Sequence, residues 1–111
     1  ARQTKRVFVE SVDFTTGLGY LEGGDSREKA GARPIRIKVV TNLAVYGFDE
    51  RTKVMKVESI HPGVTPEMIP ENTGFEMEIP QDVKVTDLPS KEELRIMRKL
   101  DPDNIRHSEF R

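Results

Sequence analysis

The sequence predicts an α/β fold, and three observations carry that prediction. Residues 35–48 (IRIKVVTNLAVYGF) form the longest run rich in β-branched and aromatic side chains, with no proline inside it. Residues 53–60 (KVMKVESI) alternate apolar and polar side chains with the period of two that is typical of a strand. The segment Ser90–Glu93 (SKEE) has the spacing of a capping box at the start of a helix. Together these patterns predict a β-hairpin over about 35–60 and a helix over about 90–100.

The first half of the predicted hairpin changes its pattern part-way. Up to Val40, apolar and polar side chains alternate, which gives a strand one apolar and one mixed face. From Leu43 to Phe48 both faces are apolar, as expected for a strand that is covered on both sides. Residues 49–52 (DERT) have the composition of a polar turn, after which the second strand returns. Adjacent strands need not pair directly, so the hairpin is the preferred of two interpretations.

The remaining elements are shorter and are separated by turn residues. Thr65 has the character of an N-cap with Pro66 at the first helical position, and Pro70 keeps that helix short. The alternation of residues 75–79 (FEMEI) predicts a strand with its two glutamates in water. We further expect a strand at 5–9 and a loop at 13–33 that contains one helical turn at 26–30. Residues 81–89 are expected to be extended. The C-terminal helix is expected to have an apolar stripe of Leu94, Met97 (or Ile96) and Leu100, and one more turn is expected within 104–111.

Composition narrows the classes of function. The length of 111 residues corresponds to a single segment the size of one small domain. Only 35% of the residues are hydrophobic and 33% are charged, so we expect a small hydrophobic core. A net charge of −1 with both signs interspersed argues against a nucleic-acid partner. No apolar run approaches the roughly 20 residues of a membrane span. The lack of cysteine excludes disulfides and thiolate metal sites.

The residue types and their spacing do not form a recognisable catalytic motif. His61 precedes Pro62 and Gly63 in a predicted turn, and it has no nucleophile at a motif spacing, so we interpret it as a structural hydrogen-bonding residue. The only other histidine is His107, and two isolated histidines make a poor zinc site. We therefore predict no catalytic residue and no metal ligand in this segment.

The loop at 15–20 (TTGLGY) is the one candidate for ligand contact. Gly17 and Gly19 begin a G-x-G pattern, but Glu22 occupies the position where the dinucleotide fingerprint requires a third glycine. Such a loop either connects two elements on the surface or faces an acyl or CoA group, because backbone N–H groups near small residues receive carbonyl or phosphate oxygens. The tentative substrate-binding residues are Thr15, Thr16, Gly17, Gly19 and Tyr20.

Four stretches in a fixed order resemble the C-terminal part of the β subunit of family I CoA-transferases, the group typified by glutaconate CoA-transferase. The first, FTTGLGYL at 14–21, is similar to the family's T-S-P-G-Y-L loop, with Thr16 and Leu18 as departures. The second, VTNLAVYGF at 40–48, is similar to V-T-D-L-A-V-F-x-F. The third is HPGVT at 61–65 with NTGF at 72–75, and the fourth runs from Pro89 to Leu100 and ends in Asp101-Pro102.

The resemblance implies an open, mainly parallel sheet of the CoA-transferase type, a cytoplasmic location and assembly with an α subunit. It implies a reaction that moves CoA from an acyl-CoA to a carboxylic acid through a glutamyl-CoA thioester, with the CoA thioester as substrate and no covalently bound cofactor. The motif that carries this glutamate lies upstream of everything matched here. The resemblance therefore implies that the chain is a partial β subunit that pairs with a missing N-terminal part, and that its loop at 15–20 approaches the active site.

Two alternatives stay open. Some members of the family lack the glutamate and resemble ring-opening hydrolases of CoA thioesters, and nothing in this sequence separates the two activities. An interaction domain without enzymatic activity is the third interpretation.

Overall fold

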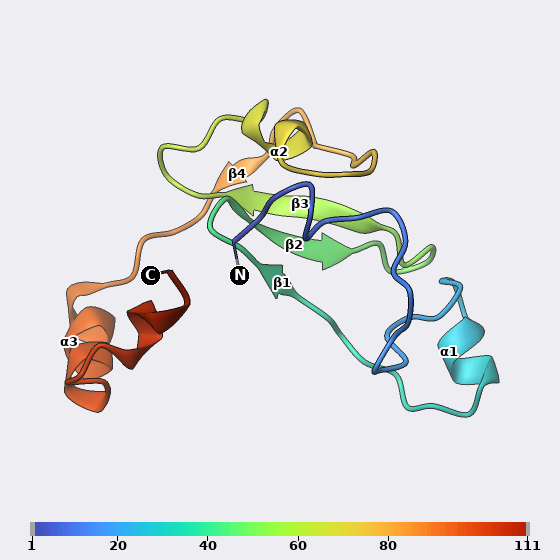
Figure 1. The fold of residues 1–111 in the computed structure, drawn as a ribbon, viewed down its shortest axis with the longest axis horizontal. Helices are drawn as coiled ribbons and strands as arrows, with labels where there is room; N and C mark the ends of the chain where they lie inside the picture. Colours follow the sequence, from blue (N-terminus) through green and yellow to red (C-terminus); the bar gives the residue numbers. More distant parts are fainter. Residues whose placement is uncertain (1, 111) are drawn as a thin grey trace.

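Four strands form one sheet in the order β1-β2-β3-β4 (Figure 1). The structure is a computed structural model that describes residues 2–110 and the side chains of residues 2–108. The strands are β1 (Val39–Val40), β2 (Ala44–Phe48), β3 (Met55–Ile60) and β4 (Lys84–Val85). The pairs β1–β2 and β2–β3 are antiparallel, and β4 runs parallel to β3. The α/β class is thus confirmed, and the part of the sheet that this chain supplies is mixed, with one parallel pairing, where the resemblance implied a mainly parallel sheet.

The predicted hairpin is confirmed in β2 and β3, which pair from Ala44–Ile60 to Phe48–Met55. The register shifts between Val45 and Tyr46. The sequence pattern did not reveal that the chain also reverses before β2, so that residues 35–48 are not one continuous strand.

A short hydrogen-bonded turn explains this reversal. The Thr41 hydroxyl accepts hydrogen bonds from the N–H groups of Leu43 at 3.0 Å and Ala44 at 3.2 Å, which replaces ladder bonds by a local side-chain turn. The N–H of Thr41 in turn donates to the Ala44 carbonyl at 3.0 Å. Only Val39–Val40 of the preceding run then pairs with β2.

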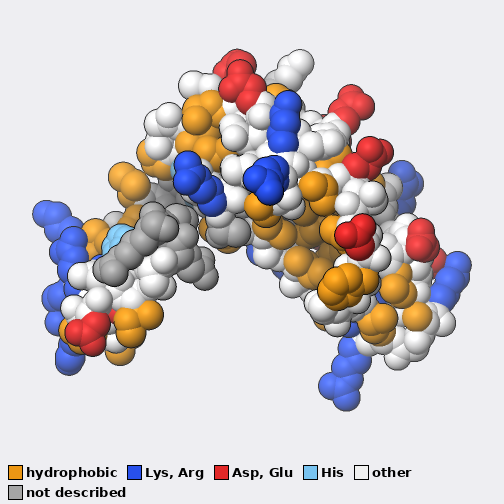
Figure 2. Space-filling view, in the orientation of Figure 1, with side chains coloured by type: hydrophobic (Ala, Val, Ile, Leu, Met, Phe, Trp, Pro, Cys, Tyr) orange, Lys and Arg blue, Asp and Glu red, His pale blue; other side chains and the backbone are white. Residues whose placement is uncertain are grey.

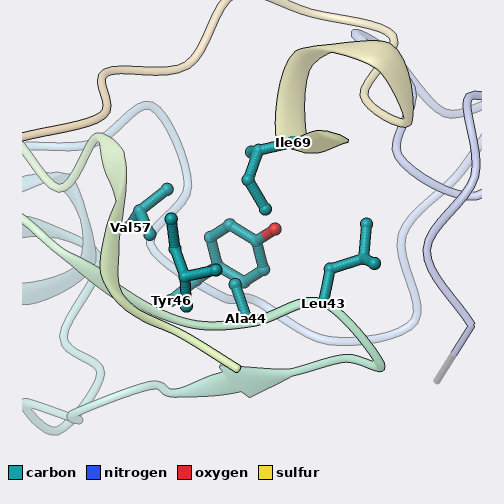
Figure 3. Close-up of a cluster of buried hydrophobic side chains, with 6 residues drawn as sticks. Leu43, Ala44, Tyr46, Val57 and Ile69 are labelled. Carbon is teal, nitrogen blue, oxygen red and sulfur yellow. The ribbon is translucent and has the colours of Figure 1, made fainter. Parts of the chain in front are cut away.

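The core is small and lies between β2, β3 and the short helix α2 (Met68–Glu71). Ile69 from α2 points towards Tyr46 and the neighbouring strand residues in Figure 3. The buried hydrophobic side chains of this core are Leu43, Ala44, Tyr46, Val57, Ile60 and Ile69. The thin core expected from composition is therefore confirmed. Many large hydrophobic side chains are instead exposed, and Figure 2 shows several of them on the visible face.

Two predicted strands are wrong, those at residues 5–9 and 75–79. Residues 5–7 form a turn in which the N–H groups of Val7 and Phe8 both donate to the Thr4 carbonyl at 2.9 Å. Residues 75–79 make only one isolated bridge, Lys56–Glu78, although their side chains alternate as predicted, with Glu76 and Glu78 exposed.

A single aromatic contact group accounts for both departures. The Phe8 ring lies 5.6 Å from the Tyr46 ring and 6.3 Å from the Phe75 ring, centroid to centroid. The Gly74 N–H donates to the Phe8 carbonyl at 2.7 Å. These tertiary contacts fix both segments side by side without a ladder of strand hydrogen bonds.

The helices follow the local signals closely. Helix α1 (Ser26–Lys29) confirms the single turn expected in the long loop, and the 3₁₀ helix η1 (Ile105–Phe110) confirms the turn near the end. Helix α2 begins after Glu67, two residues later than a cap at Thr65 would place it, because residues 65–69 close with i to i+3 bonds.

Helix α3 (Lys91–Leu100) has the predicted capping box, in which Ser90 Oγ accepts from the Glu93 N–H at 3.2 Å and Glu93 Oε2 accepts from the Ser90 N–H at 2.7 Å. Figure 1 shows α3 and η1 set apart from the sheet at the end of an extended segment. The radius of gyration is 16.3 Å. A compact domain of this length has about 13 Å, so the chain is open rather than closely packed. Of the predicted stripe, Ile96, Met97 and Leu100 are exposed and Leu94 is half-buried.

Candidate functional site

Tyr20 is the residue around which the candidate site is built. Its hydroxyl donates to the Ile35 carbonyl at 3.3 Å and accepts from the Ile37 N–H at 3.0 Å. Its ring meets the Phe48 ring edge-on at 5.0 Å, and Lys53 Nζ lies 5.6 Å from the ring centroid. Tyr20 therefore fastens the long loop to the segment before β1 and to the end of β2.

The loop that carries Tyr20 is held from its other side by Arg27 in α1. Arg27 Nη1 donates to the Gly19 carbonyl at 2.8 Å, and Nε donates to the Arg33 carbonyl at 2.6 Å. Gly19 has a φ of +51°, a left-handed conformation that glycine adopts without steric cost. The loop thus has a defined conformation without belonging to a strand or a long helix.

Two cavities adjoin Tyr20. The first, of about 460 Å³, has a polar lining that includes four cationic side chains. The second, of about 390 Å³, has a more apolar lining. Both are lined by Tyr20, Ile37, Phe48 and Lys53. The first is also lined by Ile35, Arg36, Lys38, Asp49, Glu50, Lys56 and Glu58, and the second by Gly19, Leu21, Glu22, Gly23, Thr52 and Val54.

Of the five tentative substrate-binding residues, the structure brings Gly19 and Tyr20 to these cavities. Thr15, Thr16 and Gly17 are exposed and line neither of them. The assignment of the whole loop as substrate-binding remains a prediction.

The acidic groups at the first cavity differ in how they are bound. Asp49 Oδ1 accepts from the N–H groups of Arg51 at 3.0 Å and Thr52 at 2.7 Å, and from the Thr52 hydroxyl at 2.9 Å. These hydrogen bonds, led by the one from the Thr52 backbone, lower the pKa of Asp49 from 3.8 to about 2. Glu58 forms an ion pair with Lys38. Two of the three carboxylates are therefore already engaged within the protein.

His61 lies outside these cavities and has a structural role. Its Nε2 is 2.9 Å from the Thr41 carbonyl, which only accepts hydrogen bonds, so Nε2 carries the proton. Its Nδ1 forms a hydrogen bond of 2.9 Å with the Thr86 hydroxyl. Both ring nitrogens thus join the end of β4 to the turn before β2, and His61 makes the structural hydrogen bonds that were predicted for it.

The described part of the chain shows neither a metal cluster nor a membrane span. Among residues 2–110, no group of three or more His, Cys, Asp or Glu side chains is placed to hold a metal ion. Across the same residues, no helix combines the length and apolar character that crossing a membrane demands.

Sequence reasoning missed the cations that line the first cavity, because they had been assigned only to the polar face of two strands. Arg36 and Lys38 are two positions apart in an extended segment, and Lys53 and Lys56 are three positions apart on the returning chain. Pairing of the two segments across β2 brings these groups to one cavity. The close spacing within each segment was the available signal, and it becomes informative only once the strand order is known.

Several curated proteins are similar in sequence to this chain. It is 38% identical over 109 residues to the cholesterol ring-cleaving hydrolase IpdB subunit of Rhodococcus jostii, which covers 97% of this chain and 43% of that protein. It is 35% identical over 102 residues to the B subunit of 3-oxoadipate CoA-transferase from Pseudomonas knackmussii, with 90% and 39% covered. It is 32% identical over 102 residues to the B subunit of glutaconate CoA-transferase from Acidaminococcus fermentans, with 88% and 38% covered. The chain is homologous to the C-terminal part of CoA-transferase B subunits.

Solved structures agree with this homology. The crystal structure of Rhodococcus jostii RHA1 IpdAB matches with a TM-score of 0.78 at 36% identity, over 95% of this chain and 42% of that one. Glutaconate CoA-transferase from Acidaminococcus fermentans matches with a TM-score of 0.72 at 30% identity, over 88% and 38%. The decarboxylase AibA/AibB, at 22% identity and a TM-score of 0.68, shares the fold. No family model matches the sequence.

The chain spans about two fifths of the length of the curated relatives that it matches. The family resemblance seen in the sequence motifs is thereby confirmed. The matched relatives include both transferase and hydrolase subunits, so homology by itself does not choose between the two activities.

Proposed function

We propose that this chain forms the C-terminal part of a B subunit in an enzyme that acts on CoA thioesters. The observation that carries the proposal is its end-to-end similarity, at 32–38% identity, to one portion of three B subunits with related names.

Transfer of CoA between carboxylic acids is the first activity that we propose. In that reaction a glutamate outside this chain attacks the acyl-CoA, which releases the acyl group as a free carboxylate and leaves a glutamyl-CoA thioester. A second carboxylate then takes the CoA, which forms the new acyl-CoA and regenerates the glutamate. Hydrolysis in the manner of a ring-cleaving hydrolase is the second candidate, and the similarity to an IpdB subunit at 38% identity favours it equally.

The partners that we propose are the N-terminal part of the B subunit and an α subunit. Three features support this assembly: the small core, the exposed hydrophobic side chains and the separation of α3 from the sheet. Exposed apolar surface of this extent is typical of a segment that is covered by neighbouring chain. The cytoplasmic location implied by the resemblance stays a prediction.

The test begins with the polypeptide that contains this sequence, isolated together with whatever chains accompany it. Intact masses and native mass spectrometry then give the subunit composition. The assembly is incubated with a panel of acyl-CoA thioesters and acceptor carboxylates in water enriched in oxygen-18. Transfer produces a new CoA thioester only when an acceptor is present, whereas hydrolysis places oxygen-18 in the product without an acceptor.

The competing interpretation, an interaction domain without enzymatic activity, makes a different prediction. A compact, heat-resistant monomer of 12.6 kDa that occurs without other chains and leaves the whole panel unchanged would support it against our proposal. The isolated 111-residue chain is expected to show no turnover under either enzymatic proposal.

A further inference from the structure

Helix α3 presents an apolar face to its surroundings. Ile96 is 44% exposed, Met97 is 40% exposed and Leu100 is 79% exposed. Residues three and four positions apart lie on the same face of a helix, so these three side chains form one patch. Figure 1 shows α3 set apart from the sheet, at the end of the extended segment that leaves β4. The face is therefore available to a partner that approaches the helix from outside the sheet.

The 3₁₀ helix η1 borders this face and is held in place by Asp101. The Asp101 carboxylate accepts from the Ile105 N–H at 2.8 Å, from the Arg106 N–H at 3.2 Å and from Arg106 Nη1 at 2.6 Å. An open hollow of about 470 Å³ remains between the two helices. It is lined by Glu93, Ile96, Met97, Leu100, Asp101 and Arg106. The hollow has room for side chains of another helix.

Charged residues border the apolar face in an ordered way. Glu92 and Lys99 are seven positions apart, which is about two helical turns, so they lie on the same edge of α3 and flank Ile96. The helix dipole favours acidic residues at the start of a helix and basic residues at its end. It does not require that both lie on one edge of the apolar face. Glu92 forms an exposed ion pair with Arg95, a kind of contact that is weak and easily exchanged.

This arrangement of charges is complementary to itself. When two copies of a helix pack in antiparallel orientation, the same edge of each copy meets, and the two chain directions are opposed. Glu92 then lies opposite Lys99 of the second copy, and Lys99 lies opposite its Glu92. Ile96 meets Met97 of the second copy near the two-fold axis. A parallel pair would instead place like charges against each other. Self-complementarity of this kind is what a two-fold symmetric contact requires.

We infer that the apolar face of α3 is an interface for a second copy of this chain, with the two α3 helices antiparallel. A helix of ten residues is about 15 Å long, and two such helices bury less than the roughly 1,200 Å² of a stable interface. The contact therefore links two assembled proteins rather than two isolated chains. The inference does not depend on which reaction the enzyme catalyses.

The test uses the assembled protein that contains this chain and measures its association over a range of concentrations by analytical ultracentrifugation. The variants are Glu92→Lys, Lys99→Glu and the double exchange of both residues. The matched control is Lys91→Glu, which reverses a charge on the opposite side of the same helix. Circular dichroism and thermal unfolding of each protein show whether the fold is retained.

We expect each single exchange to weaken the association of two assemblies about tenfold, because two attractive pairs become repulsive at the symmetric contact. The double exchange is expected to restore the wild-type association, and so is an equimolar mixture of the two single variants. An effect on the helix dipole alone would add up in the double exchange instead of cancelling. Lys91→Glu is expected to associate like the wild type.

A second measurement locates the contact directly. This chain contains no cysteine, so an introduced cysteine marks one position in it. We expect a short bifunctional thiol reagent to join two copies of the chain in Ile96→Cys, because residue 96 lies beside the two-fold axis. The control Lys91→Cys lies away from the contact and is expected to stay unlinked. Equal cross-linking in both variants would contradict the antiparallel pairing.

Other occupants of the face give different results with Met97→Asp, and each would overturn the inference. If another part of the same subunit covers α3, this variant destabilises the subunit itself. If a different subunit covers α3, the variant loses that subunit and the stoichiometry in native mass spectrometry changes. Under our inference, the composition of each assembly stays the same and only the association of two assemblies is lost. The same change at exposed Val85 in β4 is expected to leave that association intact.

Discussion

The Tyr46 hydroxyl donates a hydrogen bond of 2.5 Å to Oε1 of Gln3, a residue 43 positions earlier in the chain. Gln3 is 2% exposed, and its Oε1 also accepts from the Thr41 hydroxyl at 2.9 Å. Its Nε2 donates to Thr73 Oγ1 at 3.0 Å, and its backbone N–H donates to Asn42 Oδ1 at 2.7 Å. One glutamine thus connects the start of the chain, the turn before β2 and the end of α2.

The first prediction concerns Gln3→Leu. It leaves the Tyr46 hydroxyl without its partner, whereas the hydroxyls of Thr41 and Thr73 each lose one of several hydrogen bonds. A buried polar group that loses its partner costs about 1–3 kcal/mol. The free energy of unfolding, measured by urea denaturation of the subunit that carries this chain, is therefore expected to fall by more than it does in Tyr46→Phe, because Gln3→Leu also removes the bonds to Thr41 and Thr73.

The double variant Gln3→Leu with Tyr46→Phe serves as the control. Its loss of stability is expected to be smaller than the sum of the single losses, because both members of one pair are then apolar. Strict additivity would contradict a direct interaction between the two side chains.

The second prediction compares two glycines. A Cβ at Gly74 would lie 2.6 Å from the Phe8 carbonyl oxygen and 3.3 Å from that of Lys5, and backbone atoms cannot easily move away. A Cβ at Gly47 would overlap Oε1 of Glu58, which is the far end of a flexible side chain. Gly74→Ala is therefore expected to destabilise the chain more than Gly47→Ala.

Hydrogen exchange distinguishes the two variants. Gly74→Ala is expected to raise the exchange rate of the turn at residues 4–8, because the bond from the Gly74 N–H to the Phe8 carbonyl holds that turn. Gly47→Ala is expected to leave that turn protected. Similar exchange in both variants would show that the contact with Phe8 is unimportant.

The third prediction concerns pH and Asp49. Its pKa in the folded chain, about 2, is below its ordinary value of 3.8, because the carboxylate accepts three hydrogen bonds in its turn. A lowered pKa contributes stability that is present above about pH 4 and is lost as the pH falls towards 2. Asp49→Ala is expected to be less stable than the wild type at neutral pH, and this difference is expected to shrink between about pH 4 and pH 2.

Denaturation curves at several pH values measure this difference, with Glu50→Ala as the matched control in the same turn. If the difference between Asp49→Ala and the wild type stays constant from neutral pH down to the pKa of Asp49, the hydrogen bonds in the turn do not depend on the charge of the carboxylate.

The fourth prediction separates folding from assembly at β2. Ala44 is fully buried, whereas Val45 at the next position is only half-buried. Ala44→Asp is expected to prevent folding, since it buries an unpaired charge. Val45→Asp is expected to leave the chain folded and to impair assembly, because the second face of the strand is incompletely covered by this chain alone. Size-exclusion chromatography with circular dichroism distinguishes the two effects, and normal assembly of Val45→Asp would show that this face stays exposed.

The sequence by itself determined the elements whose hydrogen bonds close within a few residues. The capping box at Ser90, the polar turn at Asp49 and the hairpin between β2 and β3 all appeared as predicted. The alternation of residues 75–79 also predicted which side chains face water, although it could not predict that a ladder fails to form. Such features depend on neighbouring residues, whose spacing is fixed by the chain.

Only the tertiary structure decided what happens between distant residues. Segments that lie far apart in sequence are joined in three places. Gln3 is buried against Tyr46, His61 bonds to both Thr41 and Thr86, and Arg36 and Lys53 line the same cavity beside Tyr20. A turn replaced the expected strand at residues 5–9 for the same reason, because the contacts of Phe8 with Tyr46 and Phe75 outweigh a local preference for extended backbone. A local sequence pattern does not specify which distant segment a side chain will contact. These features therefore follow from strand order and packing.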